Sequence, residues 1–233
     1  LLNAVQTATP VVLLTVLARD LKLVSVYVVY NMVIAGVNGI LGIFMNGLQA
    51  GFGEIIAKGE QETLQRAYGE FEFMYYNLIG IAYTVTFLSI QPFIRLYTEG
   101  ITDIDYNVPI FAALFVVNAM LYSIKTPQGM ITLAAGLYKE QRVQITVQGI
   151  IPLILGFFLV PEYGIIGVLI SMIASNISRD VEIPYFVNKS LLPGSHFKTY
   201  FRMIVYLSAF AGICFFFPEN IMLIDSYFEW LVY

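Results

Sequence analysis

The most prominent feature of this sequence is a series of long apolar runs separated by short polar segments. Seven runs occupy residues 1–18, 23–52, 71–94, 108–136, 143–160, 164–184 and 200–217, and a partial eighth occupies 221–233. About 20 apolar residues in a helix span the hydrocarbon core of a bilayer, and such runs are the main sequence signal for transmembrane helices. The pattern therefore predicts an all-α, polytopic transmembrane helical bundle of about seven to eight spans. The mixed-charge segment 53–70 has helical spacing and is expected to form an interfacial helix.

The composition agrees with a membrane environment. Of the 233 residues, 58% are hydrophobic and only 12% are charged, whereas soluble globular proteins carry roughly 25% charged residues. That is too little charge to cover a soluble domain of this size, and a very large apolar protein interface is a weaker explanation than lipid. Because the sequence opens without Met inside one apolar run and closes inside another, we expect it to be part of a larger, transporter-sized protein.

The Lys and Arg residues are distributed unevenly between the loops. Loops two, four and six contain Lys58, Arg66, Lys139, Arg142, Arg179, Lys189, Lys198 and Arg202, whereas the other loops contain Arg19, Lys22 and Arg95. Cytoplasmic loops of membrane proteins carry the excess of basic residues. This distribution predicts that loops two, four and six are cytoplasmic and that residue 1 lies on the cytoplasmic side.

The second apolar run carries polar residues at helical spacing. Tyr27, Asn31, Asn38 and Gln49 project within about 40° of one another on a helix. One interpretation is a helix face that lines a wet cavity. The other is hydrogen bonding between closely packed helices. Glycines permit such close packing, and this run contains several of them, four of which lie at positions 36, 39, 42 and 47.

The fourth run contains a lysine, Lys125, far from both of its ends. Placing an ammonium group there costs about 2.5–3.5 kcal/mol even on lenient insertion scales, so Lys125 predicts a cavity or a buried partner. Asn118 and Tyr122 share its helical face, and Pro127 is expected to break the helix, as in spans from which transporters build binding sites. The alternative is a lysine paired with a carboxylate or water in a purely structural crevice.

Two further runs contribute polar groups. Gln148 lies one or two turns inside the fifth run, and the sixth contains Ser175 and Asn176 before the charged pair Arg179 and Asp180. We expect that charged pair to lie at the membrane interface in contact with solvent. The candidate cavity residues are therefore Lys125, Asn118, Tyr122, Asn31, Asn38 and Gln148.

Several kinds of chemistry have no support in the sequence. It lacks a phosphate-binding GxxxxGK[ST] loop and an HExxH motif, and it contains one histidine and one cysteine. Its basic residues are sparse and dispersed, which does not favour nucleic-acid binding. We therefore expect no cofactor, no metal site and no catalytic residues.

Three segments carry a resemblance to a known family. The stretch from Asp20 to Met32, DLKLVSVYVVYNM, resembles the start of the second helix in the C-terminal bundle of bacterial polysaccharide flippases. The run GLQAGFG at 47–53 and the segment VPEYGIIGV at 160–168 resemble two later connections of the same proteins. These flippases belong to the multidrug/oligosaccharidyl-lipid/polysaccharide exporter superfamily. The resemblance implies a MATE-like C-terminal six-helix bundle over residues 1–190, followed by additional C-terminal helices over 191–233.

The resemblance also implies a function. Polysaccharide flippases translocate undecaprenyl-diphosphate-linked oligosaccharide from the cytoplasmic to the outer leaflet of the bacterial inner membrane, without enzymatic chemistry, and the resemblance implies the same function here. Implied partners are the lipid-linked oligosaccharide, membrane lipids, the N-terminal bundle of the same protein, and glycan polymerase and glycosyltransferases. Two alternatives stay open, namely an organic-cation antiporter of the same superfamily and a membrane-embedded polysaccharide polymerase or acyltransferase. An antiporter would favour a central carboxylate, and the predicted spans centre on Lys125 with no central Asp or Glu.

Overall fold

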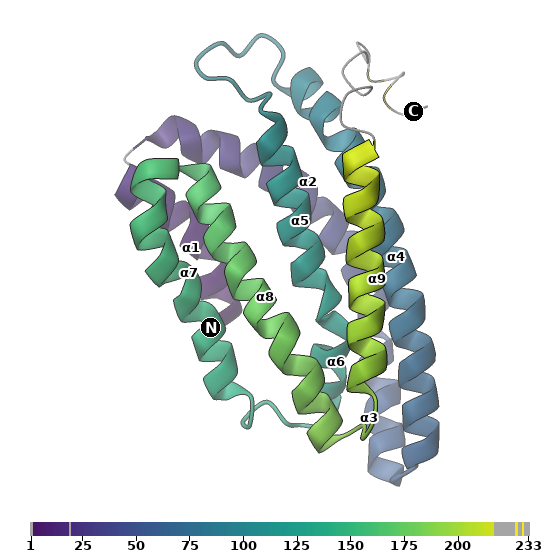
Figure 1. Cartoon of the computed structure of the whole chain (residues 1–233). Coiled ribbons are helices and arrows are strands. Elements are labelled where there is room, and N and C mark those ends of the chain that lie inside the picture. Colours follow the sequence, from purple (N-terminus) through teal and green to yellow (C-terminus); the bar gives the residue numbers. More distant parts are fainter. Residues whose placement is uncertain (1, 19, 217–226, 228–229, 231–233) are drawn as a thin grey trace.

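The computed structural model describes residues 2–18, 20–216, 227 and 230 (Figure 1). Over these residues every regular element is helical. The elements are α1 (Leu2–Leu13), the π-helical turn η1 (Leu14–Ala18), α2 (Leu21–Asn46), α3 (Leu48–Lys58), α4 (Gln61–Tyr97), α5 (Pro109–Ile124), α6 (Thr126–Ala134), α7 (Arg142–Tyr163), α8 (Ile165–Ser190) and α9 (His196–Phe216). The prediction of an all-α fold is therefore confirmed, while most of the partial run at 221–233 lies outside the described residues.

Five helical segments are long and apolar enough to cross a membrane, which indicates a multi-pass membrane protein. They are Leu21–Lys58, Gln61–Tyr97, Pro109–Ala134, Arg142–Tyr163 and His196–Phe216. The first predicted run forms α1 and η1, in which Ala8–Ala18 counts as a shorter apolar helix. The sixth predicted run forms α8, whose second half carries Arg179, Asp180 and Glu182 and is correspondingly less apolar. The predicted number of spans remains a prediction.

The helices run along the long axis of the molecule, with their connections at two opposite ends (Figure 1). The α3–α4, α6–α7 and α8–α9 connections share one end, and the η1–α2, α4–α5 and α7–α8 connections share the other. The loops that were predicted to be cytoplasmic therefore lie together. The segment 53–70 is helical but not a separate helix, because Gly59 in the left-handed conformation ends α3 and α4 then continues for 37 residues.

The fourth apolar run is broken where the sequence predicts it. α5 ends at Ile124, α6 begins at Thr126, and Lys125 lies at the junction between them. Pro127 occupies the first turn of α6, where its missing N–H is tolerated although it cannot continue the hydrogen-bond ladder of α5. The break leaves Lys125 at depth within the bundle rather than at the end of a span.

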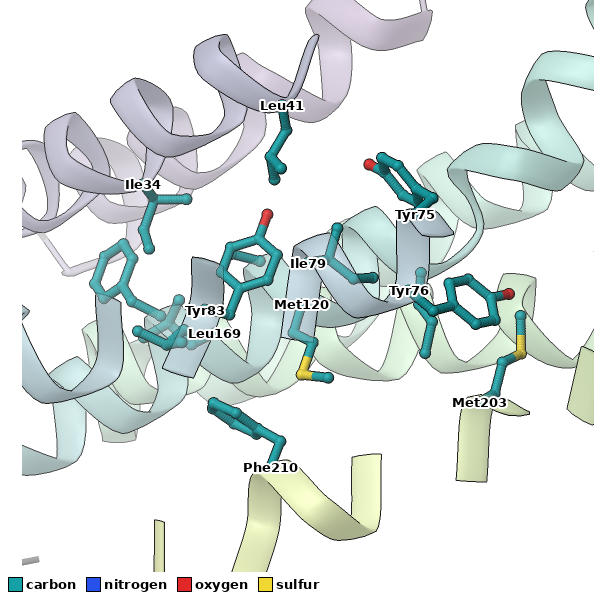
Figure 2. Packing of buried hydrophobic residues seen from close by; sticks show 14 of the residues in the cluster. Ile34, Leu41, Tyr75, Tyr76, Ile79, Tyr83, Met120, Leu169, Met203 and Phe210 are labelled. Carbon is teal, nitrogen blue, oxygen red and sulfur yellow. The ribbon is translucent and has the colours of Figure 1, made fainter. Parts of the chain in front are cut away.

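The core is centred on one face of α4, and Figure 2 shows this packing. Tyr76, Ile79 and Tyr83 of α4 are completely buried. Residues from four neighbouring helices surround them, including Ile34 and Leu41 of α2, Met120 of α5, Leu169 of α8, and Met203 and Phe210 of α9. Because tyrosine carries a hydroxyl group on an apolar ring, this core brings hydrogen-bonding groups into the bundle interior.

The helices α7 and α8 form a tight antiparallel hairpin. Gly164 at the turn has a φ of 52°, a conformation that strongly favours glycine. At Gly167 the backbones are so close that a Cβ atom would lie 2.5 Å from the carbonyl oxygen of Leu159. This hairpin places the polar residues of α8 beside Gln148 of α7.

Candidate functional site

A cavity of about 320 Å³ lies among α2, α5, α7 and α8, with α1 at its edge. Its polar lining consists mainly of carboxamides from three helices, namely Asn31 and Asn38 of α2, Asn118 of α5 and Asn176 of α8. Aromatic rings of Tyr27, Phe115 and Tyr122 complete much of the wall. Four of the six predicted cavity residues, Asn31, Asn38, Asn118 and Tyr122, therefore line one cavity.

The other two predicted residues, Lys125 and Gln148, lie directly behind the wall. The Lys125 Nζ donates hydrogen bonds to Asn176 Oδ1 at 2.9 Å and to the carbonyl oxygen of Leu121 at 3.0 Å. Gln148 Nε2 donates to the same Asn176 oxygen at 3.4 Å. Asn176 Nδ2 in turn donates to Asn118 Oδ1 at 3.0 Å. Asn176 thus connects both predicted residues to the cavity.

The charge of Lys125 has a partner on α8. Its Nζ lies 3.6 Å from Asp180 Oδ1, and the two side chains are only 11% and 10% exposed. The Nζ also lies 5.1 Å from the ring centroid of Tyr122, which lines the cavity, whereas Lys125 itself is not among the lining residues. Lys125 is therefore a neutralised cation behind the wall and not a free cation that faces the cavity.

The expectation that Arg179 and Asp180 are solvated at the interface is wrong. Arg179 is 5% exposed and contacts Gln141 and Glu182, and Asp180 is 8% exposed. The cause is the length of α8, which continues to Ser190. Both residues thus lie inside the helix, where Asp180 contacts Lys125 at the α5–α6 junction and Arg179 contacts Gln141 just before α7. The expectation that the spans contain no central carboxylate is also wrong, because Asp180 lies buried beside Lys125.

Both interpretations of the polar face of α2 apply, and Asn38 combines them. Asn38 Oδ1 accepts a hydrogen bond from the Tyr83 hydroxyl at 2.6 Å, and that hydroxyl lies 2.6 Å from Ser123 Oγ. Asn38 therefore links α2 to α4 and α5 as well as lining the cavity. Asn31 lines the cavity without a hydrogen bond to any residue that the structure describes. Gln49 is exposed outside the cavity.

Three of the four glycines lie in α2 and the fourth, Gly47, lies at the α2–α3 junction. None of them marks close helix packing in the described structure. Cβ atoms added at Gly36, Gly39, Gly42 and Gly47 would meet no atom within 4 Å. Their side of the helix is open, in contrast to Gly167 in the α7–α8 hairpin.

A second buried polar cluster, which the sequence did not predict, surrounds Glu72 of α4. The Glu72 carboxylate accepts hydrogen bonds from Tyr68 at 3.1 Å, Gln128 at 3.0 Å and Thr199 at 2.7 Å, and it pairs with Arg202 at 2.7 Å. The cluster joins α4 to α6 and α9. Glu72 is the second residue of the apolar run 71–94, so its sequence position suggested a residue at the membrane surface and not a buried one.

Metal-binding chemistry has no candidate in the described part of the chain, where no group of three or more His, Cys, Asp or Glu residues could hold an ion. The polar groups of the site are amides, hydroxyls and one ion pair, which bind ligands through hydrogen bonds. Comparisons with protein-family models, with curated proteins and with solved structures find no match to this chain.

Proposed function

We propose that this chain forms part of a flippase that translocates undecaprenyl-diphosphate-linked oligosaccharide from the cytoplasmic to the outer leaflet of the bacterial inner membrane. Translocation of this kind supplies surface polysaccharide biosynthesis and breaks no covalent bond. The observation that carries the proposal is a cavity lined by four asparagines and three aromatic rings inside the helical bundle. The segments that resemble polysaccharide flippases support the same function.

The lining suits a carbohydrate headgroup. Sugar hydroxyls both donate and accept hydrogen bonds, as do carboxamides, so Asn31, Asn38 and Asn118 can replace part of the water around a sugar. A polar group without such partners is costly in a bilayer. The rings of Tyr27 and Tyr122 offer apolar faces against which a sugar ring can stack. The polyprenyl tail needs no site because it remains in the lipid.

In this proposal the chain corresponds to a MATE-like C-terminal bundle with additional C-terminal helices, and residue 1 faces the cytoplasm. The N-terminal bundle of the same protein would complete the cavity, and the two bundles would give alternating access by moving against each other. The shared end of the α3–α4, α6–α7 and α8–α9 connections supports this orientation, because the basic loop residues lie there. Glycosyltransferases and a glycan polymerase would act before and after the flippase.

The organic-cation antiporter is the weaker alternative. A cationic substrate would favour an unpaired carboxylate on the cavity wall. The two most buried carboxylates near the bundle centre are each paired, Asp180 with Lys125 and Glu72 with Arg202. The cavity wall itself consists of neutral carboxamides, which favour a neutral, oxygen-rich group.

Complementation of a flippase-deficient bacterial strain tests the proposal. The full-length protein is expected to restore surface polysaccharide, and Asn118→Leu is expected to abolish it while membrane abundance is unchanged. Ile81→Leu, at a 67% exposed position on α4, is the matched control and is expected to behave like the wild type. Full surface polysaccharide with Asn118→Leu, or no complementation by the well-expressed wild type, would contradict the proposal.

A further inference from the structure

We propose that Lys125 is a positioning residue that fixes the direction of a side-chain hydrogen-bond relay and thereby turns the amide N–H groups of Asn118 into the cavity. The relay runs from Lys125 through Asn176 to Asn118. It gives this part of the wall the character of a hydrogen-bond donor. The inference rests on the proposed function, because it takes the oxygen-rich headgroup of the lipid-linked oligosaccharide as the ligand that contacts this wall.

The direction of the relay follows from the chemistry of its first member. A lysine ammonium group carries three donors and no acceptor. The Asn176 atom that lies 2.9 Å from Lys125 Nζ must therefore be its carbonyl oxygen. Gln148 Nε2 donates to the same oxygen, which reinforces this orientation. Asn176 is 5% exposed, so solvent does not compete for its groups.

The orientation of Asn176 determines that of Asn118. With its oxygen held by Lys125, Asn176 presents its NH₂ group to Asn118, and the atom that accepts at 3.0 Å must be the oxygen of Asn118. The NH₂ group of Asn118 then makes no hydrogen bond to any described residue, and Asn118 lines the cavity. The N–H donors of Asn118 therefore remain available to a ligand in the cavity.

The wall is therefore suited to ligand oxygens that accept hydrogen bonds. Such oxygens occur in sugar rings, in acetamido groups and in phosphate groups. Because Asp180 neutralises Lys125 and Lys125 is not among the residues that line the cavity, Lys125 acts through the relay and not by direct attraction of an anion. A neutral ligand should then depend on Lys125 as strongly as an anionic one.

Exchange of the asparagine side-chain amide protons tests the direction of the hydrogen-bond relay without any ligand. The protein labelled with ¹⁵N-asparagine is reconstituted in lipid nanodiscs, and Asn118→Leu and Asn176→Leu assign the two side-chain signals. The Asn176 NH₂ protons are expected to exchange about tenfold more slowly than those of Asn118, the factor for one hydrogen bond. Lys125→Gln combined with Asp180→Asn removes the obligatory donor together with its counter-charge, and should reduce this difference to less than about threefold. Slower exchange at Asn118 in the wild type, or an unchanged difference in the double variant, would overturn the relay.

Ligand binding tests the consequence. The probes are undecaprenyl-diphosphate-linked N-acetylglucosamine, undecaprenyl diphosphate without sugar, and a neutral alkyl N-acetylglucosaminide. The Lys125→Gln/Asp180→Asn variant is expected to bind the two sugar probes about 3- to 10-fold more weakly than the wild type, the value of one hydrogen bond. Lys125→Arg keeps a donor-only cation and should stay within about threefold of the wild type.

The outcomes separate the relay from the proposed function. If only the diphosphate probes are weakened, Lys125 attracts the anion directly and the positioning role is refuted. If the neutral sugar and the sugar-free diphosphate are both weakened, both sources of acceptor oxygen use the same donor wall. If the wild type shows the expected exchange pattern but binds none of the three probes, the relay stands and the proposed function is contradicted.

Discussion

The ion pair between Lys125 and Asp180 makes a specific prediction about stability. Lys125→Met leaves the Asp180 carboxylate, which is 8% exposed, without the cation at 3.6 Å. Neither oxygen of Asp180 has a hydrogen-bond partner among the described residues, so little else compensates its charge. Removing one member of a buried pair costs about 3–5 kcal/mol. An independent estimate from Coulomb's law at this distance, with an effective dielectric constant of about 20, gives roughly 4–5 kcal/mol.

The double variant Lys125→Met/Asp180→Leu should be much more stable than either single variant. Replacing a buried ion pair by apolar side chains of similar volume is often neutral or stabilising, because the desolvation penalty of both charges disappears. The expected coupling energy in the double-mutant cycle is therefore about 4 kcal/mol or more. The measurement is the free energy of unfolding in mixed detergent micelles for the four proteins of the cycle.

The refuting result is additivity. If each single substitution costs less than about 1 kcal/mol and the two costs add in the double variant, the groups do not interact as a buried pair. The same double variant also separates stability from the relay. It should fold, because neither Lys125 nor Asp180 is left as an unpaired charge, yet it should bind the two sugar probes about 3- to 10-fold more weakly, as expected for the loss of one hydrogen bond.

Two further predictions concern other parts of the bundle. Arg202→Leu should destabilise the protein by about 3–5 kcal/mol because it leaves Glu72 buried without a cation, and thermal unfolding should show that adding Glu72→Gln recovers most of this loss. Gly167→Ala should lower the unfolding free energy by about 1–3 kcal/mol, because its Cβ would meet the backbone of Leu159. Gly36→Ala, where a Cβ would meet nothing within 4 Å, is the control and should be close to neutral; equal effects of the two alanines would contradict the close approach.

The sequence predicted those parts of the structure that depend on local pattern. Long apolar runs gave the helices, and Pro127 gave the break beside Lys125, because a proline acts on its own helix. One cavity is also lined by four of the candidate residues, namely Asn31, Asn38, Asn118 and Tyr122. Their helical spacing was sufficient to place them on inward-facing sides of two spans.

The partners of these residues could not be predicted, because they depend on how distant helices pack. Asp180 is separated from Lys125 along the chain by α6, α7 and the first half of α8, and its neighbours Arg179 and Glu182 made it resemble a solvated helix end. Asn176 appeared as one polar residue among several in its run. Only the packing of α8 against α5 shows that it connects Lys125 to Asn118.

The central claim, that this cavity carries the headgroup across the membrane, is tested most directly by transport in proteoliposomes. Translocation of a labelled undecaprenyl-diphosphate-linked oligosaccharide is measured for the wild type, for Asn118→Trp, which fills the cavity, and for Ile81→Trp, at the exposed face of α4. The account predicts transport above protein-free liposomes by the wild type and Ile81→Trp, and none by Asn118→Trp. Transport by Asn118→Trp at the wild-type rate, or none by the folded wild type, would contradict it.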